Sequence, residues 1–149
     1  MSDIIRAAEH LIIIARNTSP ISADNLNSAE TQTKALQGWG QRVWTLPEVI
    51  LSKGDYVTVA TKLNQGSQIS KLHLGEIAWP DAGHSRQLVE HFTNLPLSRL
   101  ELVSVAMKCL DKRELQGKHK GDRSYALMGL LRVRPRIDTT DSSFQAFAR

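Results

Sequence analysis

The stretch "IIRAAEHLIIIAR", from Ile4 to Arg16, decides the fold class of this chain. Residues 3–10 have the composition of a short helix, whereas the run that starts at Leu11 is short, uniformly apolar and rich in β-branched side chains. Such a run is typical of a fully buried strand. A helix that leads directly into a buried strand is typical of α/β proteins, so the stretch predicts an α/β domain.

Turn, capping and alternation signals predict several short elements after this strand. The sequence "DYVTVAT", residues 55–61, places Val57 and Val59 on one face of a predicted strand, and Tyr56 on the other. Ser98 followed by Glu101 fits a capping box at the start of a helix. The other expected elements are a loop over residues 17–28, a helix from near residue 30 that the glycines at 38 and 40 weaken or end, a short strand near 71–74, a turn at 80–83, a helix capped by Asp122, and a last short helix from residue 141.

Two of the predicted helices are amphipathic, and their apolar spacing predicts the face that each one buries. In the helix before Pro96 the predicted buried residues are Leu88, Phe92 and Leu95. In the helix after Ser98 they are Leu100, Val103, Met107 and Leu110. The sequence therefore predicts a helix-rich α/β domain with few strands and several amphipathic helices.

The chain length and its single cysteine limit the class of protein. At 149 residues the chain fits one compact domain. Cys109 is the only cysteine, so an internal disulfide is impossible and the common zinc sites, which need pairs of cysteines, are excluded. The apolar run from Leu11 is too short for a membrane span and lacks a secretory leader. A cytoplasmic location is expected.

The basic residues are concentrated at the C-terminal end. Residues 1–107 carry 9 Lys+Arg and 10 Asp+Glu, whereas residues 108–149 carry 10 and 5. A nucleic-acid-binding domain would add stacking aromatic residues or a reading motif, and "RVRPRI", residues 132–137, has neither. We interpret the basic end as solvated surface, with nucleic-acid binding as a remote alternative.

The familiar catalytic and metal-binding patterns are absent from the sequence. The histidines do not have metal-ligand spacing, and the glycines form neither a P-loop nor a dinucleotide-binding fingerprint. No nucleophile elbow supports a serine hydrolase. No metal is expected.

The segment "GWGQRVWTLPEVILS", Gly38 to Ser52, allows two interpretations of Glu48. Thr45 and Glu48 fit a capping box, in which Glu48 is only a helix cap. Alternatively, Trp39, Arg42 and Trp44 form a stiff, partly apolar wall, beside which a desolvated carboxylate would have a raised pKa.

The same residues carry a resemblance to a known family. The pattern Trp39-x-x-Arg42-x-Trp44-x-x-x-Glu48 resembles the "W-x-x-R-x-W-x-x-Q-E-x-x-L" signature of the fungal heterokaryon incompatibility (HET) domain. The later "GDRSYALMGL", Gly121 to Leu130, resembles the second signature of that family, an aspartate followed by "Y-A-L-L-G-L". Asp122 and Tyr125 belong to this second motif, although an N-cap and a core aromatic residue explain them without a function.

The resemblance covers residues 1–131, and residues 132–149 are expected to be a basic extension that ends within a helix. Two features depart from the family. Pro47 replaces the glutamine before the glutamate, and the N-terminal strand motif "S-Y-x-W-G" is missing. The chain thus resembles the later part of a HET domain.

The resemblance implies both a fold and a function. HET domains trigger programmed cell death when genetically unlike fungal hyphae fuse, and they are similar to the TIR domains of innate immunity, which implies a partial TIR-like or flavodoxin-like arrangement. The resemblance also implies that the protein is an interaction module, which signals through protein partners or self-association. The alternative that it implies is a TIR-like NAD glycohydrolase, with NAD as substrate, Glu48 as the catalytic carboxylate, and Trp39, Arg42 and Trp44 as binding residues.

Overall fold

The computed structural model describes residues 10–14, 28–61, 64–115, 120–133, 140 and 142–148. Nearly all of the helix predicted over residues 3–10, and nearly all of the loop predicted over residues 17–28, lie outside the described residues. The described elements are β1 (Ile12–Ile14), α2 (Ser28–Gly40), α3 (Thr45–Leu51), β2 (Tyr56–Thr61), β3 (Asn64–Ser70), α4 (Lys71–Ala78), α5 (Ala82–Thr93), α6 (Arg99–Asp111), α7 (Asp122–Leu130) and α8 (Ser143–Phe147).

The described strands form one mixed sheet with the order β1-β2-β3. β1 pairs parallel to β2, with Ile13 opposite Val59, and β2 pairs antiparallel to β3. The strand predicted after Leu11 is present, but the prediction that it is fully buried is wrong, because Ile13 is buried while Ile12 and Ile14 are 59% and 66% exposed. The strand predicted over residues 55–61 is β2, and its predicted alternation is confirmed: Val57 and Val59 are buried, while Tyr56 on the other face is 62% exposed. The predicted helix-rich α/β class with few strands is confirmed as well.

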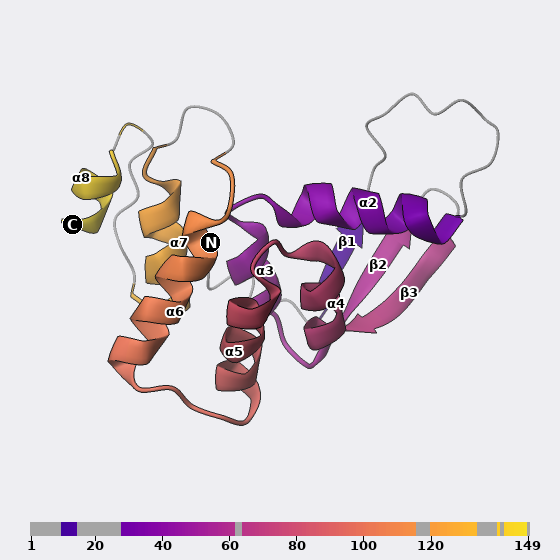
Figure 1. Ribbon diagram of the computed structural model, residues 1–149, viewed down its shortest axis with the longest axis horizontal. Coiled ribbons are helices and arrows are strands. Elements are labelled where there is room, and N and C mark those ends of the chain that lie inside the picture. Colours follow the sequence, from indigo (N-terminus) through magenta and orange to yellow (C-terminus); the bar gives the residue numbers. More distant parts are fainter. Residues whose placement is uncertain are drawn as a thin grey trace.

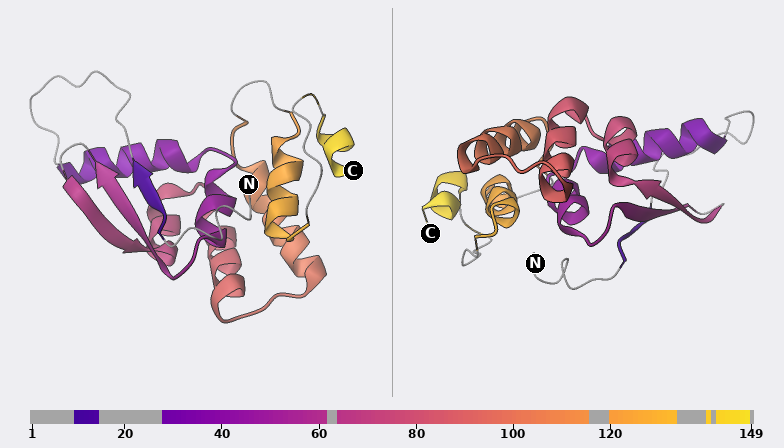
Figure 2. Two further views of the ribbon diagram at one scale, coloured as in Figure 1. Left: turned by 180° about the vertical axis from the view of Figure 1, so that it is seen from behind. Right: turned by 90° about the horizontal axis from the view of Figure 1, so that it is seen from below.

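Helices α2 and α4 cover one face of the sheet, as the view from below shows (Figure 2). Leu36 of α2 and Leu74 of α4 join Val59 of β2 in the main hydrophobic core. α3 and α5 continue from this layer toward α6, α7 and α8, which lie at the opposite end of the molecule from the sheet (Figure 1). α3 contacts both α5 and α7, so the segment from Gly38 to Ser52 sits where the two parts of the fold meet.

The capping box predicted before α6 is confirmed. The Ser98 hydroxyl accepts from the Glu101 amide, and the Glu101 carboxylate accepts from the Ser98 amide at 2.9 Å. These bonds satisfy amides that have no partner within the helix, and so they fix the first turn.

The buried face predicted for α6 is wrong at two positions. Leu100 is 81% exposed and Met107 is 50% exposed. The residues that α6 buries are Leu102, Val105, Ala106, Cys109 and Leu110. This face also has helical spacing, and it is the one that meets α5 and α7. In the preceding helix Leu88 is buried, but Leu95 lies beyond the end of α5 and is 64% exposed.

The strand predicted near residues 71–74 is also wrong. These residues begin α4, and the Ser70 hydroxyl caps the helix by accepting from the His73 amide at 3.2 Å. The strand is instead the preceding polar segment "NQGSQIS", which forms β3. Backbone pairing with β2 supplies the hydrogen bonds that make this polar segment a strand.

Candidate functional site

The tryptophan and glutamate motif spans the end of α2 and the start of α3. Trp39 lies in the last turn of α2, Trp44 precedes α3, and both rings are partly buried against the core. Arg42 lies in the connection, where its backbone forms a bridge with Glu114, and the Glu114 amide donates to the Gln41 carbonyl at 2.8 Å. The connection is therefore anchored to the segment that follows α6.

Thr45 does not form the predicted capping box with Glu48. The N-cap of α3 is Trp44, which makes no side-chain capping bond. Thr45 is the first residue of the helix and is 1% exposed. Its hydroxyl donates back to the Arg42 carbonyl at 2.8 Å, instead of accepting from an amide of the first turn. Glu48 is therefore not part of the capping box that the first interpretation of the sequence required.

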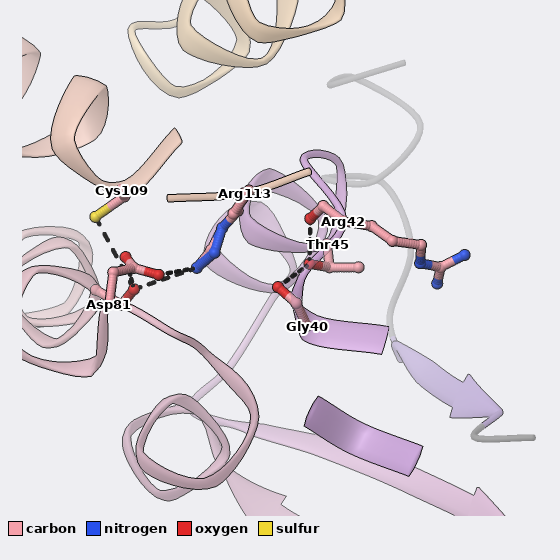
Figure 3. Close-up of polar contacts among 7 residues, drawn as sticks. Gly40, Arg42, Thr45, Asp81, Cys109 and Arg113 are labelled. Atoms are coloured by element: carbon pink, nitrogen blue, oxygen red, sulfur yellow. Dashed lines mark hydrogen bonds and ion pairs between the residues drawn. The ribbon is translucent and has the colours of Figure 1, made fainter. Parts of the chain in front are cut away.

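Glu48 lies in the first turn of α3 with its side chain partly buried. Burial raises the pKa of the Glu48 carboxyl above its ordinary value, and the positive charge of Arg42 opposes part of that rise. The Arg42 Nε donates to the Trp39 carbonyl at 3.3 Å, and Figure 3 shows its side chain directed away from Arg113 and Asp81. Arg42 thus acts on Glu48 through its charge, while its Nε is bonded to the Trp39 carbonyl.

The second motif packs against the first. Tyr125 and Met128 of α7 are buried together with Ala146 of α8, and the Trp44 side chain packs on this cluster. Two segments about eighty residues apart in the chain thus meet through one indole ring. The core position expected for Tyr125, which is 4% exposed, is confirmed.

Asp122 is not the N-cap that the sequence predicted. Gly121 occupies the N-cap position, and Asp122 is the first residue of α7 without a side-chain capping bond. Its carboxylate nevertheless lies in the first turn, where a negative charge stabilises the helix dipole.

A buried polar cluster lies between α5 and α6, and the sequence analysis missed it. Arg113 Nη2 lies 2.8 Å from Asp81 Oδ1, and the two side chains are 0% and 1% exposed. Ser85 donates to the other oxygen of Asp81, and the Cys109 thiol lies close to both (Figure 3). The spacing of Leu102, Ala106, Cys109 and Arg113 continues one helical face of α6, which is the signal that points to Arg113.

This cluster has the properties of a structural network. The Arg113 guanidinium lies 5.1 Å from the centre of the Trp79 ring, and its Nε and Nη1 have no hydrogen-bond partner among the described residues. Burial, followed by the negative charge and hydrogen bond of Asp81, raises the pKa of the Cys109 thiol far above its ordinary value. Because the reactive form of cysteine is the thiolate, this thiol is held inert.

A second feature that sequence analysis missed is a hollow of about 560 Å³ at the C-terminal ends of α3 and α5. Its polar lining residues include Ser52, Lys53, Asp55, Lys71, Asn94 and Arg132. Lys71 is 5% exposed, and its Nζ donates to the Ser52 carbonyl at 2.6 Å. A smaller hollow of about 190 Å³ lies between α2, α4 and the sheet.

Leu51, at the leucine position of the first HET-like signature, lines the larger hollow, but the side chains singled out in that motif do not. Neither lining includes Trp39, Arg42, Trp44 or Glu48. Across the part of the chain that the structure describes, no three His, Cys, Asp or Glu side chains are grouped as a metal site requires. None of the described helices has the length and apolar character needed to cross a bilayer.

Comparison of the chain with family models, with curated proteins and with solved structures finds no match.

Proposed function

We propose that this protein is a HET-domain-like module of fungal heterokaryon incompatibility, which signals programmed cell death through protein partners or self-association in the cytoplasm. One observation carries the proposal: Trp44 of the first motif packs on a buried cluster to which the second motif contributes Tyr125 and Met128. Motifs that belong to one functional unit are expected to meet in space, whereas chance similarities have no reason to do so.

The surface of the sheet supports partner binding. Ile12, Ile14 and Tyr56 lie on the face opposite the buried valines, and they are 59%, 66% and 62% exposed. Large apolar side chains gathered on one exposed face are typical of surfaces that contact other proteins.

The test is expression of the protein in a filamentous fungus, with hyphal viability as the readout. We expect loss of viability with the natural sequence and survival with Trp44→Ala, which removes the contact between the motifs. Leu100→Ala is the matched control, because Leu100 is 81% exposed and outside both motifs. Full viability with the natural sequence, at confirmed expression, would contradict the proposal.

A second candidate function is a TIR-like NAD glycohydrolase, favoured by the state of Glu48. Its carboxylate is partly buried, is not used in the expected capping box, and has a raised pKa. Cleavage of the bond between nicotinamide and ribose develops positive charge on the ribose, which a fixed carboxylate would stabilise in the transition state. Trp39 and Trp44 would contact the ligand and Arg42 a phosphate.

Release of nicotinamide from NAD tests this candidate. We expect Glu48→Gln to abolish release while the circular dichroism spectrum is unchanged. Glu76→Gln is the control, because Glu76 is an exposed glutamate on α4, outside both motifs. Turnover that survives Glu48→Gln would exclude Glu48 as the catalytic residue. No turnover by the natural sequence would leave the interaction module as the remaining candidate function.

A further inference from the structure

The hollow at the ends of α3 and α5 carries an excess of positive charge. Among the lining residues that the structure describes, Lys53, Lys71 and Arg132 are cationic, and Asp55 is the one carboxylate. In a concave surface with apolar walls such charges act together, because the surrounding solvent screens them less than on an open surface. The hollow is therefore suited to an anion.

Lys71 provides a buried cation, and its ammonium group has donors that no described residue accepts from. An ammonium group has three N–H donors, and the Ser52 carbonyl accepts from one of them at 2.6 Å. The side chain is 5% exposed, and within the described part of the chain it makes no ion pair with a carboxylate. Burial lowers the pKa of Lys71, and nearby Asp55 opposes that fall. An anion in the hollow would compensate the buried charge.

Arg132 occupies a backbone position that favours glycine. It follows α7 with a φ of 61°, and its amide donates to the Gly129 carbonyl while the Val133 amide donates to the Met128 carbonyl. This pattern is a Schellman motif with Arg132 at the left-handed position, which is usually glycine. A strained residue at the wall of a hollow points to a function for its side chain.

The remaining walls suit an organic group. The Arg132 guanidinium lies 5.7 Å from the centre of the Phe92 ring, so the charge is held beside an aromatic wall. Ile50, Leu51 and Val89 add apolar surface, and Asn94 adds an amide. The volume of about 560 Å³ exceeds what one phosphate group fills and is within the ordinary range of sites for small ligands.

We propose that this hollow binds a small phosphorylated molecule, whose phosphate is held by Lys53, Lys71 and Arg132 and whose organic part lies against Phe92 and Val89. The site does not include Trp39, Arg42, Trp44 or Glu48, and the proposal does not depend on the function proposed above. A phosphate that belongs to a soluble metabolite and a phosphate that belongs to a lipid headgroup share this chemistry.

The test measures binding of pyrophosphate and of inorganic phosphate by isothermal titration calorimetry. We expect pyrophosphate to bind in the millimolar range or tighter, and Arg132→Gly to weaken binding by about tenfold or more. Glycine is the residue that the backbone favours at this position, so the melting temperature should not fall. If it does fall, Arg132→Gln and Lys71→Met repeat the test with side chains of similar size.

Lys108→Gln is the matched control, because Lys108 is an exposed cation on α6 that does not line the hollow. We expect it to change pyrophosphate affinity by less than about twofold, since distant surface charges are screened. Equal losses with Arg132→Gly and Lys108→Gln would show unspecific charge attraction and would overturn the proposal.

A flotation assay with vesicles that contain phosphatidic acid distinguishes the two sources of phosphate. One outcome is that the protein binds the vesicles, that Arg132→Gly abolishes this binding, and that soluble pyrophosphate does not bind. This outcome would support the site and assign it to a lipid headgroup. Absence of binding to pyrophosphate, phosphate and vesicles alike would overturn it.

Discussion

Arg113 and Asp81 form an ion pair with 2.8 Å between Nη2 and Oδ1, and neither side chain is more than 1% exposed. The pair joins Arg113, two residues beyond the end of α6, to the residue before α5, and it is surrounded by Trp79, Ser85 and Cys109. A buried charge that loses its partner is strongly destabilising, so this pair is a point at which the fold can be tested.

We expect Arg113→Met to lower the free energy of unfolding by about 3–5 kcal/mol, because it leaves the Asp81 carboxylate buried without a counter-charge. Arg86→Met is the control, since the Arg86 and Glu90 side chains are 60% and 31% exposed, and its effect should stay within about 1 kcal/mol. Urea denaturation measures both. The double variant Arg113→Met with Asp81→Leu should be more stable than the single variant, and losses that simply add would contradict this explanation.

Two glycines of α2 should respond to alanine in opposite directions. A Cβ at Gly40 would lie 2.1 Å from the Ala78 carbonyl oxygen, whereas a Cβ at Gly38 would have no atom within 4 Å. We expect Gly40→Ala to destabilise the protein by at least about 2 kcal/mol, because α2 and α4 must separate. Gly38→Ala should stabilise it by about 0.5–1 kcal/mol, because it restricts the unfolded chain. Thermal melts of the two variants check both signs; a Gly40→Ala variant as stable as the parent would exclude the close contact.

The contact between the two motifs should be visible as an energetic coupling between Trp44 and Met128. In a double-mutant cycle with Trp44→Leu and Met128→Ala, we expect the combined loss of stability to differ from the sum of the single losses by about 0.5–1.5 kcal/mol. Trp44→Leu combined with Leu100→Ala should be additive within about 0.5 kcal/mol, because the second site is distant. Additivity in both pairs would mean that α3 and α7 do not touch through Trp44.

Stability should depend on pH through Glu48 and Glu101 with opposite signs. Burial raises the pKa of Glu48, so its contribution is present below the ordinary glutamate pKa of roughly 4.3 and is lost as pH rises through the folded-state value. Hydrogen bonds from Ser98 lower the pKa of Glu101, so its contribution is present above the ordinary value and is lost on acidification.

Urea denaturation of Glu48→Gln and Glu101→Gln at pH 4 and pH 7 tests these two signs. Relative to the natural sequence, Glu48→Gln should gain stability between pH 4 and pH 7, and Glu101→Gln should lose stability over the same interval. Parallel profiles for the two variants would contradict the burial of Glu48.

Strong local signals were sufficient to predict part of the fold. The alternation of residues 55–61 predicted the strand and the separation of its two faces, and Ser98 with Glu101 predicted the start of α6. In both places the stabilising contacts lie within a few residues of each other, so the local sequence contains the information needed.

Other features depend on contacts between distant segments. Two faces of α6 have helical apolar spacing, and only packing against α5 and α7 decides that Cys109 is buried and Met107 exposed. β3 is too polar to be recognised without its partner β2. At the candidate site, the motif positions were predictable, but the turn that directs the Thr45 hydroxyl to Arg42, and the hollow around Lys71, come from tertiary packing.

The parallel pairing of Ile13 with Val59 has a consequence for the order of folding. β1 leaves the ribosome long before β2 exists, while the β2–β3 hairpin and the contacts of α5 with α6 close over short loops. Because closing a long loop carries a larger entropic penalty, β1 should add to a hairpin that has already formed. During synthesis the apolar β1 segment is therefore unpaired until β2 has formed. In that interval it is the segment that a chaperone would bind.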